Sequence, residues 1–435
     1  MTRIVLVGAG SVEFTRNLLG DLLSYPELRS ADIVLHDIDP DRLATAKRMA
    51  RWTAGALGAE PRIEASLDRR RALRGADFVV DTIQVGGARA TRIDFDIPAR
   101  YGLRYTINDT INVGGVLRGL RSIPVVLDIV RDMEDLCPDA WFLNYTNPMS
   151  MLVWAASVAS PVRTVGLCHS VFWTIDAIAR YLGIAREEID HLSAGVNHLA
   201  FLLRLERDGR DLYPALRRMA HEGRIPDDDL VRAELFRRLG FYPTESSEHH
   251  AEYSPWFIPK GDSVARFNIP IGEYLDRVAH NLDEFAETKR RLDAGEPFEI
   301  ERSGEYAAII VHSMLTGQPA RIVGNVMNRG ALIPNLAAEA CVEVPCLVDG
   351  LGVHPIAVGP LPPQCAAYIH PAVDAQGLTV KAALEEHRDA VYHAIMQDPQ
   401  VQARLTLEEA WAMTDELIAA EAEWLPRWLG GTAPS

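Results

Sequence analysis

Short apolar segments alternate with helical patterns over the first part of the chain. Residues 3–7, 32–35 and 77–84 are short runs rich in β-branched residues, which is the pattern of buried strands. Residues 14–24 and 40–57 repeat their apolar positions every three or four residues, as amphipathic helices do. Strands that are apolar on both faces and are joined by helices belong to parallel sheets covered on each side. The pattern therefore predicts a doubly wound α/β fold.

The next segments continue the alternation. A helix is predicted over residues 123–136, and strands are predicted at 140–143 and 164–167. We expect this fold to occupy residues 1–170 and a second, α+β part to occupy residues 171–435.

The second part has a less regular pattern. Residues 199–207 are predicted to form one arm of a hairpin, and residues 240–272 form a loop region rich in aromatic residues and proline. Helices return from about residue 377, and their apolar positions are expected to face the body of the protein at Trp411, Leu417, Ile418, Trp424 and Leu425.

Composition and charge narrow the function classes. The 435 residues include 44 Lys plus Arg against 60 Asp plus Glu, a formal net charge of −16. Such an acidic surface repels phosphate backbones, so a nucleic-acid partner is not expected. The five cysteines form no CxxC pair, which predicts reduced thiols and a cytoplasmic protein. No stretch has the roughly 18 uncharged apolar residues of a membrane helix, so no membrane partner is expected either.

A glycine motif follows the first predicted strand. Gly8-Ala-Gly10 precedes a helix, and Asp37 follows the second strand. In a Rossmann fold this arrangement lets a dinucleotide pyrophosphate approach the backbone, and the acidic residue binds the adenosine ribose. We therefore predict an NAD site that also includes Ser11 and Phe14. Because Glu13 stands where the third glycine is usual, a simple turn is the alternative.

Polar residues also follow a later predicted strand, in the segment Asn144-Tyr-Thr-Asn147-Pro148. Ligands of open α/β sheets bind at the carboxyl ends of strands. The Asn147 amide can both donate to and accept from a sugar hydroxyl or a nicotinamide amide. A turn that only precedes proline is the alternative interpretation.

Two further candidates come from the second part of the chain. Cys168 and His198 each follow a predicted strand near a glycine, and a thiolate with an imidazole suits a divalent cation such as Mn, Fe, Co or Zn. A buried cysteine and a core histidine are the alternative. The segment 244–257 collects carboxylates, imidazoles, a phenol and aromatic rings, which could bind a sugar and move protons or could form a polar surface loop.

Taken together, these residues resemble the family-4 glycoside hydrolases, which depend on NAD and a divalent metal and share the fold of lactate and malate dehydrogenases. The similarity covers nearly the whole chain and is strongest to the bacterial α-galactosidase branch. It rests on an ordered series of stretches: Gly8-Ala-Gly-Ser11, Leu143-Asn-Tyr-Thr-Asn-Pro-Met149, Val165-Gly-Leu-Cys-His-Ser-Val171, Ala194-Gly-Val-Asn-His-Leu-Ala-Phe201, residues 244–257, Cys341-Val-Glu-Val-Pro-Cys-Leu-Val-Asp349 and Trp424-Leu-Pro-Arg-Trp-Leu429.

The resemblance implies roles for individual residues. Cys168 and His198 would hold the cation, usually Mn²⁺, which chelates the 2- and 3-hydroxyl oxygens of the sugar. Asn144 would belong to the NAD site, and Asn147 and Arg92 to the substrate site. Relatives that act on 6-phosphosugars carry Asp or Asn at the position of His169, so their leaving-group acid has no counterpart here, although we include His169 among the catalytic residues. Tyr253 is our candidate for the base, with His249 as its rival.

The resemblance also implies a mechanism and a substrate. NAD⁺ oxidises C3 of the sugar, the C2 proton becomes acidic, elimination expels the C1 oxygen, and water addition and re-reduction complete a cycle without net redox change. The expected substrates are unphosphorylated α-galactosides. The segment Ile111-Asn112-Val113 departs from the Leu-Gly-Pro usual in this branch, so α-glucosidase and α-galacturonidase activities stay open.

Two alternatives lie outside the glycosidases. One is an NAD-dependent 2-hydroxy acid dehydrogenase, and the other is an NAD-bound sensor without catalysis. A homodimer or homotetramer is expected from the resemblance.

Overall fold

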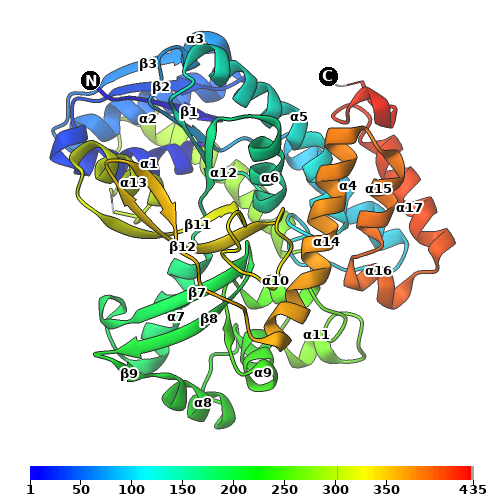
Figure 1. Ribbon diagram of the computed structural model, residues 1–435. Coiled ribbons are helices and arrows are strands. Elements are labelled where there is room, and N and C mark those ends of the chain that lie inside the picture. Colours follow the sequence, from blue (N-terminus) through cyan, green and yellow to red (C-terminus); the bar gives the residue numbers. More distant parts are fainter. Residues whose placement is uncertain (301, 433–435) are drawn as a thin grey trace.

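The computed structural model describes residues 1–300 and 302–432. Its N-terminal part is a six-stranded parallel sheet in the order β3-β2-β1-β4-β5-β6, which confirms the predicted doubly wound fold. The strands are β1 (Arg3–Val7), β2 (Asp32–His36), β3 (Arg62–Ser66), β4 (Phe78–Asp81), β5 (Trp141–Asn144) and β6 (Arg163–Gly166). The helices that join them are α1 (Val12–Ser24), α2 (Pro40–Ala56), α3 (Arg69–Leu73), α4 (Gly87–Arg100), α5 (Val113–Leu136) and α6 (Met149–Ala159) (Figure 1).

Two elements of this part differ from the prediction. β3 has no apolar run, because it lies at the edge of the sheet and none of its residues is fully buried. α5 begins at Val113 rather than at residue 123, because Gly114 and Gly115 lie inside its first turn and not in a loop. A Cβ on Gly114 would lie 2.3 Å from the carbonyl oxygen of Asn108, so these glycines let the helix pack directly on the preceding loop.

The sheet continues past β6 with antiparallel strands in the order β11-β12-β7-β8-β10. Their bounds, with those of the two outlying strands, are β7 (Asp190–Val196), β8 (Leu199–Arg207), β9 (Arg210–Asp211), β10 (Tyr242–Pro243), β11 (Ala320–Met327), β12 (Cys341–Asp349) and β13 (Gly352–Pro355). β8 and β9 form the predicted hairpin. The two parts of the chain thus share one sheet, and the boundary at residue 170 stays a prediction.

Helices of the second part cover this sheet and close the molecule. Those that follow β6 are α7 (Ser170–Leu182), α8 (Tyr213–His221), α9 (Leu230–Leu239), α10 (Ser247–Glu252), α11 (Ser263–Arg266), α12 (Glu273–Ala294) and α13 (Tyr306–Thr316). α10 and α11 lie within the segment predicted as a loop. The C-terminal helices are α14 (Pro363–Glu385), α15 (Arg388–Ile395), α16 (Pro399–Arg404) and α17 (Leu407–Ala420).

The C-terminal helices return to the N-terminal part, where α14 packs on α5 and α6 and α17 packs on α4 (Figure 1). The buried Arg121 of α5 joins them, because its guanidinium lies 2.7 Å from Asp94 of α4 and 2.8 Å from Glu421. Of the five positions expected to face the body, Leu417, Ile418 and Leu425 are buried, Trp424 is half-buried, and Trp411 stacks on Tyr392 at 4.7 Å but keeps 37% of its surface exposed.

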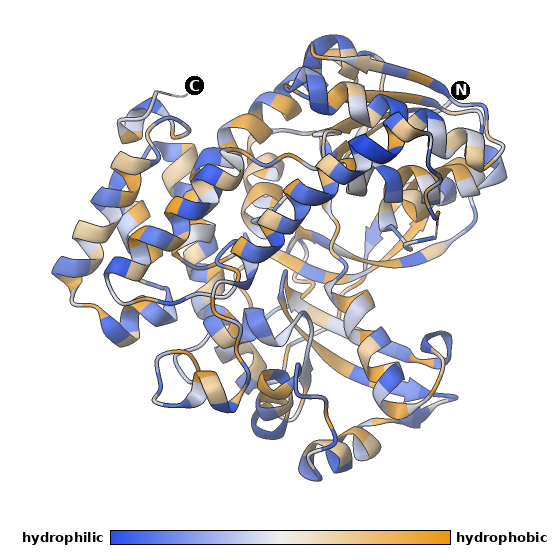
Figure 2. Cartoon of the chain, turned by 180° about the vertical axis from the view of Figure 1, so that it is seen from behind, coloured by the Kyte–Doolittle hydropathy of each residue, from blue (hydrophilic) through white to orange (hydrophobic). Residues whose placement is uncertain are grey.

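Hydropathy follows this architecture. Hydrophobic positions concentrate in the strands and on the inner sides of helices, whereas the outer helix faces are hydrophilic (Figure 2). Among the described residues, no helix combines the length and the apolar character needed to cross a membrane.

Candidate active site

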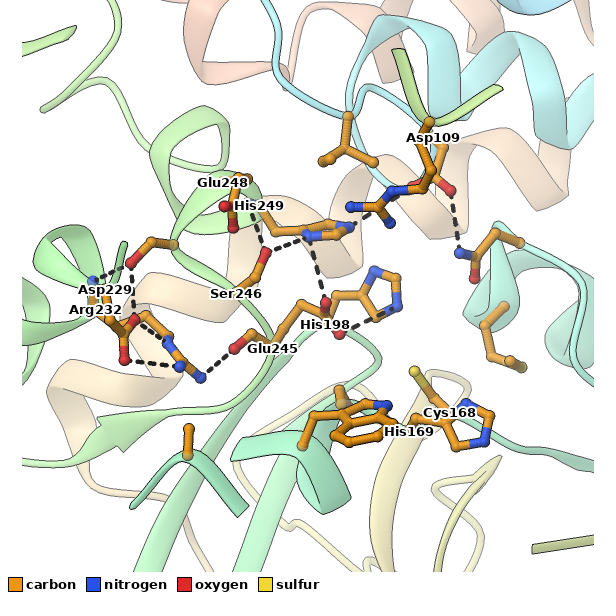
Figure 3. A pocket seen from close by; sticks show the side chains of 18 of the residues that line it. Asp109, Cys168, His169, His198, Asp229, Arg232, Glu245, Ser246, Glu248 and His249 are labelled. Carbon is orange, nitrogen blue, oxygen red and sulfur yellow. Dashed lines mark hydrogen bonds and ion pairs between the residues drawn. The ribbon is translucent and has the colours of Figure 1, made fainter. Parts of the chain in front are cut away.

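A cavity of about 530 Å³ opens where the carboxyl ends of the parallel strands meet α7 and α10 (Figure 3). The sequence predicts site residues in segments far apart in the chain, and the structure brings six of them to this cavity: Phe14, Asn147, Cys168, His169, His198 and His249. Arg92 is exposed on α4 and is not among the lining residues. The fold therefore does not place Arg92 near the other candidates within one chain.

Cys168 and His198 do come together, and a carboxylate joins them. One ligand atom each from Cys168, His198 and Glu245 lie within 4.8 Å of one another, and His198 forms a second such group with Asp109 and His249. The turn conformations that bring the side chains in are left-handed at His198 (φ +63°), between β7 and β8, and at Glu245 (φ +70°), after β10. Sequence reasoning missed Glu245 and Asp109 as ligand candidates, although Glu245 lies in the segment 244–257 and Asp109 lies two residues before the segment 111–113.

Hydrogen bonds orient the His198 ring. Thr110 Oγ1 donates to Asp109 Oδ1 at 2.7 Å and lies 3.0 Å from His198 Nδ1, so it accepts from an N–H at that nitrogen. Nε2 is the ring nitrogen left for a cation, and it lies 3.6 Å from Glu245 Oε2. An imidazole held by one nitrogen and free at the other is the usual form of a metal ligand.

The Cys168–His198–Glu245 cluster attracts positive charge. Burial lowers the pKa of His198, but the Glu245 carboxylate and the neighbouring Cys168 raise it more, to about 10. The protein alone therefore favours a positive charge at this point. A divalent cation held by a thiolate, an imidazole and a carboxylate would meet the same demand, so the donor set fits Mn²⁺ and related ions.

His169 is held by a carboxylate that the sequence did not suggest. Its Nε2 lies 2.8 Å from Glu305 Oε2, and the ring stacks on Tyr145 at 5.9 Å. Glu305 is buried, and its own backbone N–H donates to Asp21 at 2.6 Å. Burial lowers the pKa of His169, but the hydrogen bond to Glu305 and the charge of that carboxylate raise it by more. The pKa is therefore raised overall. The pair forms an oriented imidazole at the wall of the cavity.

The two candidates for the base lie side by side, with ring centres 5.8 Å apart. His249 lines the cavity, and its Nδ1 lies 2.9 Å from Ser246 Oγ. Burial lowers the pKa of His249 to about 3. Tyr253 is buried behind it and does not line the cavity.

In the protein without a cation, burial, followed by the neighbouring Glu252 and Asp109, holds the pKa of Tyr253 well above its usual range. The Tyr253 hydroxyl has no hydrogen-bond partner among the described residues.

The glycine motif forms a tight turn directly after β1. Gly8 has a φ of +82°, and a Cβ there would lie 2.7 Å from the carbonyl carbon of Thr82. The Gly10 N–H donates to Asp37 Oδ2 at 2.7 Å, and a Cβ on Gly10 would lie 2.5 Å from that oxygen. The Ser11 side chain makes no capping hydrogen bond to α1, and the N-terminus of a helix is a favourable place for an anion. These residues fit a dinucleotide.

Two other residues predicted for this site lie close by. Phe14 contacts Tyr145 edge-to-face at 5.1 Å and lines the cavity. Asn144 is buried beneath the loop after β5, where its amide donates to the carbonyl of Thr146 at 2.9 Å, and its Oδ1 has no partner among the described residues. Asn147 Nδ2 donates to Asp109 Oδ2 at 3.1 Å, which joins the predicted substrate residue to the metal cluster.

Comparison with known proteins agrees with this geometry. A model described as "Family 4 glycosyl hydrolase" matches residues 3–184, and one described as "Family 4 glycosyl hydrolase C-terminal domain" matches residues 193–401. The chain is 41% identical over 432 residues to an alpha-galactosidase of Bacillus subtilis, with 98% of this chain and 100% of the relative covered. It is 37% identical over 439 residues to an alpha-galactosidase of Rhizobium meliloti (98% and 89% covered) and 32% identical over 457 residues to an alpha-glucosidase of Erwinia rhapontici (98% and 99% covered).

Solved structures share the fold. A 6-phospho-alpha-glucosidase from gut microorganisms, in complex with NAD and Mn²⁺, superposes with a TM-score of 0.84 at 21% identity and covers 98% of this chain and 99% of its own. Lactate dehydrogenase from Eimeria maxima, with NADH and oxamate, gives a TM-score of 0.54 at 16% identity (89% and 97% covered), in line with the expected dehydrogenase-like fold. The two family models together span most of the chain, and this protein belongs to the family 4 glycosyl hydrolases.

Proposed function

We propose that this protein hydrolyses unphosphorylated α-galactosides with the help of NAD and a divalent cation, Mn²⁺ in the first place. The proposal rests above all on one observation: the Cys168–His198–Glu245 cluster and the glycine cradle of a dinucleotide fold border the same sheet edge. Phe14 and Asn147 line the cavity between them. The names of the two α-galactosidase relatives support the sugar.

The chain has residues suited to bind both NAD and the divalent cation. Gly8, Gly10, Ser11 and Asp37 would hold NAD, and Cys168 with His198 would hold the cation. When bound, NAD supplies a reversible acceptor for a hydride, and the cation supplies positive charge that polarises sugar oxygens and acidifies neighbouring protons.

The protein's own side chains do the remaining work. Asn147, held by Asp109, presents its amide oxygen to a sugar hydroxyl. His169, oriented by Glu305, serves the leaving group, as a histidine in hydrogen-bond reach of that oxygen can exchange a proton with it. Tyr253 remains our candidate base for the C2 proton, because a cation held by the neighbouring cluster would lower the pKa that burial raises. His249, next to it, is the alternative base.

Charge in the cavity favours a neutral sugar. Within the described residues, each arginine that lines the cavity already forms an ion pair with a carboxylate. The pairs are Arg180 Nε with Asp176 at 3.3 Å, Arg232 Nε with Asp229 at 2.5 Å and Arg277 Nη2 with Glu273 at 2.8 Å. Carboxylates also line it, at Asp109, Asp228, Asp229, Glu245 and Glu248. A phosphate or uronate group would enter without a free cation and leave a poorly compensated charge.

A panel of nitrophenyl α-glycosides tests this proposal. With NAD⁺, Mn²⁺ and dithiothreitol present, we expect kcat/KM for the α-galactoside to exceed that for the α-galacturonide about 100-fold or more, the effect of one poorly compensated charge. The variant Glu273→Gln, which releases Arg277, should raise the relative rate on the galacturonide several-fold without improving the galactoside. A preference of the unchanged protein for the galacturonide would refute the neutral-sugar proposal, and a preference for the α-glucoside would reassign the sugar.

Assembly and location complete the proposal. We propose a homodimer or homotetramer, for which the partly exposed Trp411 on α17 offers one apolar contact. We also propose a cytoplasmic location, because the five cysteines are free and four of them are buried as thiols.

A further inference from the structure

A buried carboxyl group lies in the middle of the sheet, in a strand to which the mechanism assigns no role. Glu343 belongs to β12, between the apolar residues Val342 and Val344, and is 1% exposed. Its Oε1 has no hydrogen-bond partner among the described residues. Such a group costs stability in an apolar strand, so its presence calls for a reason.

Glu343 lies at the joint between the two halves of the sheet. The parallel half meets the antiparallel half through a single register pair, Gly166 of β6 with Asn325 of β11. Asn325 pairs in turn with Glu343, and Glu343 forms the single register pair of β12 with β7, at Gly195. Gly166, Asn325, Glu343 and Gly195 therefore form one row of paired residues that runs across the strands from β6 to β7.

The side chains of this row are linked as well. Asn325 Nδ2 donates to the carbonyl oxygen of Gly166 at 3.4 Å and to Glu343 Oε2 at 3.1 Å. Asn197 Nδ2 donates to the same Glu343 oxygen at 3.5 Å. Asn325 and Asn197 are fully buried, so water does not compete for these bonds.

Each end of this chain of hydrogen bonds lies beside a proposed metal ligand. Gly166 precedes Cys168 by two residues, and Asn197 precedes His198 in the two-residue turn between β7 and β8. The backbone is tightly packed at both ends. A Cβ on Gly166 would lie 2.5 Å from Met149 Sδ, and one on Gly195 would lie 2.4 Å from the carbonyl oxygen of Leu199. The separation of the two ligands is therefore set by the row.

We infer that Glu343, together with Asn325 and Asn197, is a positioning device that fixes the distance between Cys168 and His198 for a divalent cation. This inference rests on the proposed function. Glu343 belongs to neither candidate ligand group and does not line the cavity. It accepts hydrogen bonds from the side-chain amides of Asn325 and Asn197. Groups that orient metal ligands in this indirect way typically affect metal affinity about 10–100-fold.

Mn²⁺ binding to metal-free protein, measured by electron paramagnetic resonance of the free ion, tests the inference. Glu343→Val removes the acceptor and is expected to weaken Mn²⁺ binding about 10-fold or more. Glu343→Gln keeps one carbonyl acceptor for the two amides and should bind within about 3-fold of the unchanged protein, since only the geometry and not the charge is needed. Asn325→Ala removes the donor in the same series of hydrogen bonds and should weaken Mn²⁺ binding as much as Glu343→Val does. Asn325→Ala also replaces Glu343→Val in the test if the latter does not fold.

A matched control separates this role from general stability. Val342→Ala opens a cavity in the same strand and should lower the melting temperature without changing Mn²⁺ affinity. With Co²⁺ in place of Mn²⁺, the thiolate-to-metal absorption band should be altered in Glu343→Val and unaltered in Val342→Ala.

Three results are decisive. Unchanged Mn²⁺ affinity and Co²⁺ spectrum in Glu343→Val and Asn325→Ala would overturn the inference and leave Glu343 as a core residue. A loss in Glu343→Gln as large as in Glu343→Val would overturn the geometric account. Failure of the unchanged protein to bind Mn²⁺ at all would instead refute the proposed function.

Discussion

Replacing Cys168 by serine should abolish Mn²⁺ binding and α-galactosidase activity together. The Cys168 sulfur is one of the candidate ligand atoms that lie within 4.8 Å of one another, and a hydroxyl is a far weaker donor than a thiolate to such an ion. Because even indirect supports of metal ligands change affinity about 10–100-fold, loss of a direct ligand should exceed about 100-fold. His198→Ala should behave in the same way. Isothermal titration with Mn²⁺ and turnover of nitrophenyl α-galactoside measure the two effects.

Cys365→Ser provides the matched control, since this cysteine is buried in α14 and belongs to neither candidate metal group. It should keep both Mn²⁺ affinity and activity. If Cys168→Ser retained full, chelator-sensitive activity, Cys168 would not be a ligand, and Asp109, His198 and His249 would become the candidate set.

The second large effect is expected at Tyr253. Tyr253→Phe removes a hydroxyl that has no partner among the described residues, so the fold should lose no stability. Turnover should nevertheless fall about 100- to 10,000-fold, the usual contribution of a general base. Exchange of the C2 proton of the sugar with deuterium from the solvent should be lost, whereas NAD and Mn²⁺ binding should stay unchanged. Nuclear magnetic resonance of the product formed in heavy water follows this exchange.

His249 provides the competing outcome. If Tyr253→Phe turned over at a near-normal rate and kept the exchange, Tyr253 would leave the mechanism. His249→Gln would then be expected to abolish the exchange, because His249 is the neighbouring side chain that lines the cavity.

The parts of the fold that follow from local pattern were predictable. β1 and β2 are mostly apolar because helices bury both faces of the sheet, so short runs such as residues 3–7 stand out in the sequence. β3 does not, since an edge strand needs no apolar run. Gly114 and Gly115 suggest a loop locally, but their lack of a side chain serves tertiary packing against the Asn108 loop.

Part of the candidate site could likewise be predicted from the sequence, and part of it could not. Cys168 and His198 could be paired from the strand ends and the resemblance, and their proximity in space agrees with that pairing. Glu245, Asp109 and Glu305 could not be assigned, because separate segments bring the first two to the cavity and the third to His169, and no spacing in the sequence encodes these distances. Arg92 shows the converse, as its place on an exposed face of α4 depends on helix packing.

The requirement for nicotinamide tests the account most directly. Protein freed of NAD by charcoal treatment, with Mn²⁺ and dithiothreitol retained, should hydrolyse nitrophenyl α-galactoside at about 1% of the normal rate or less, because loss of a cofactor that does the chemistry removes several kcal/mol of transition-state stabilisation. Addition of NAD⁺ should restore the rate without net accumulation of NADH. Undiminished hydrolysis by the NAD-free protein would contradict the account.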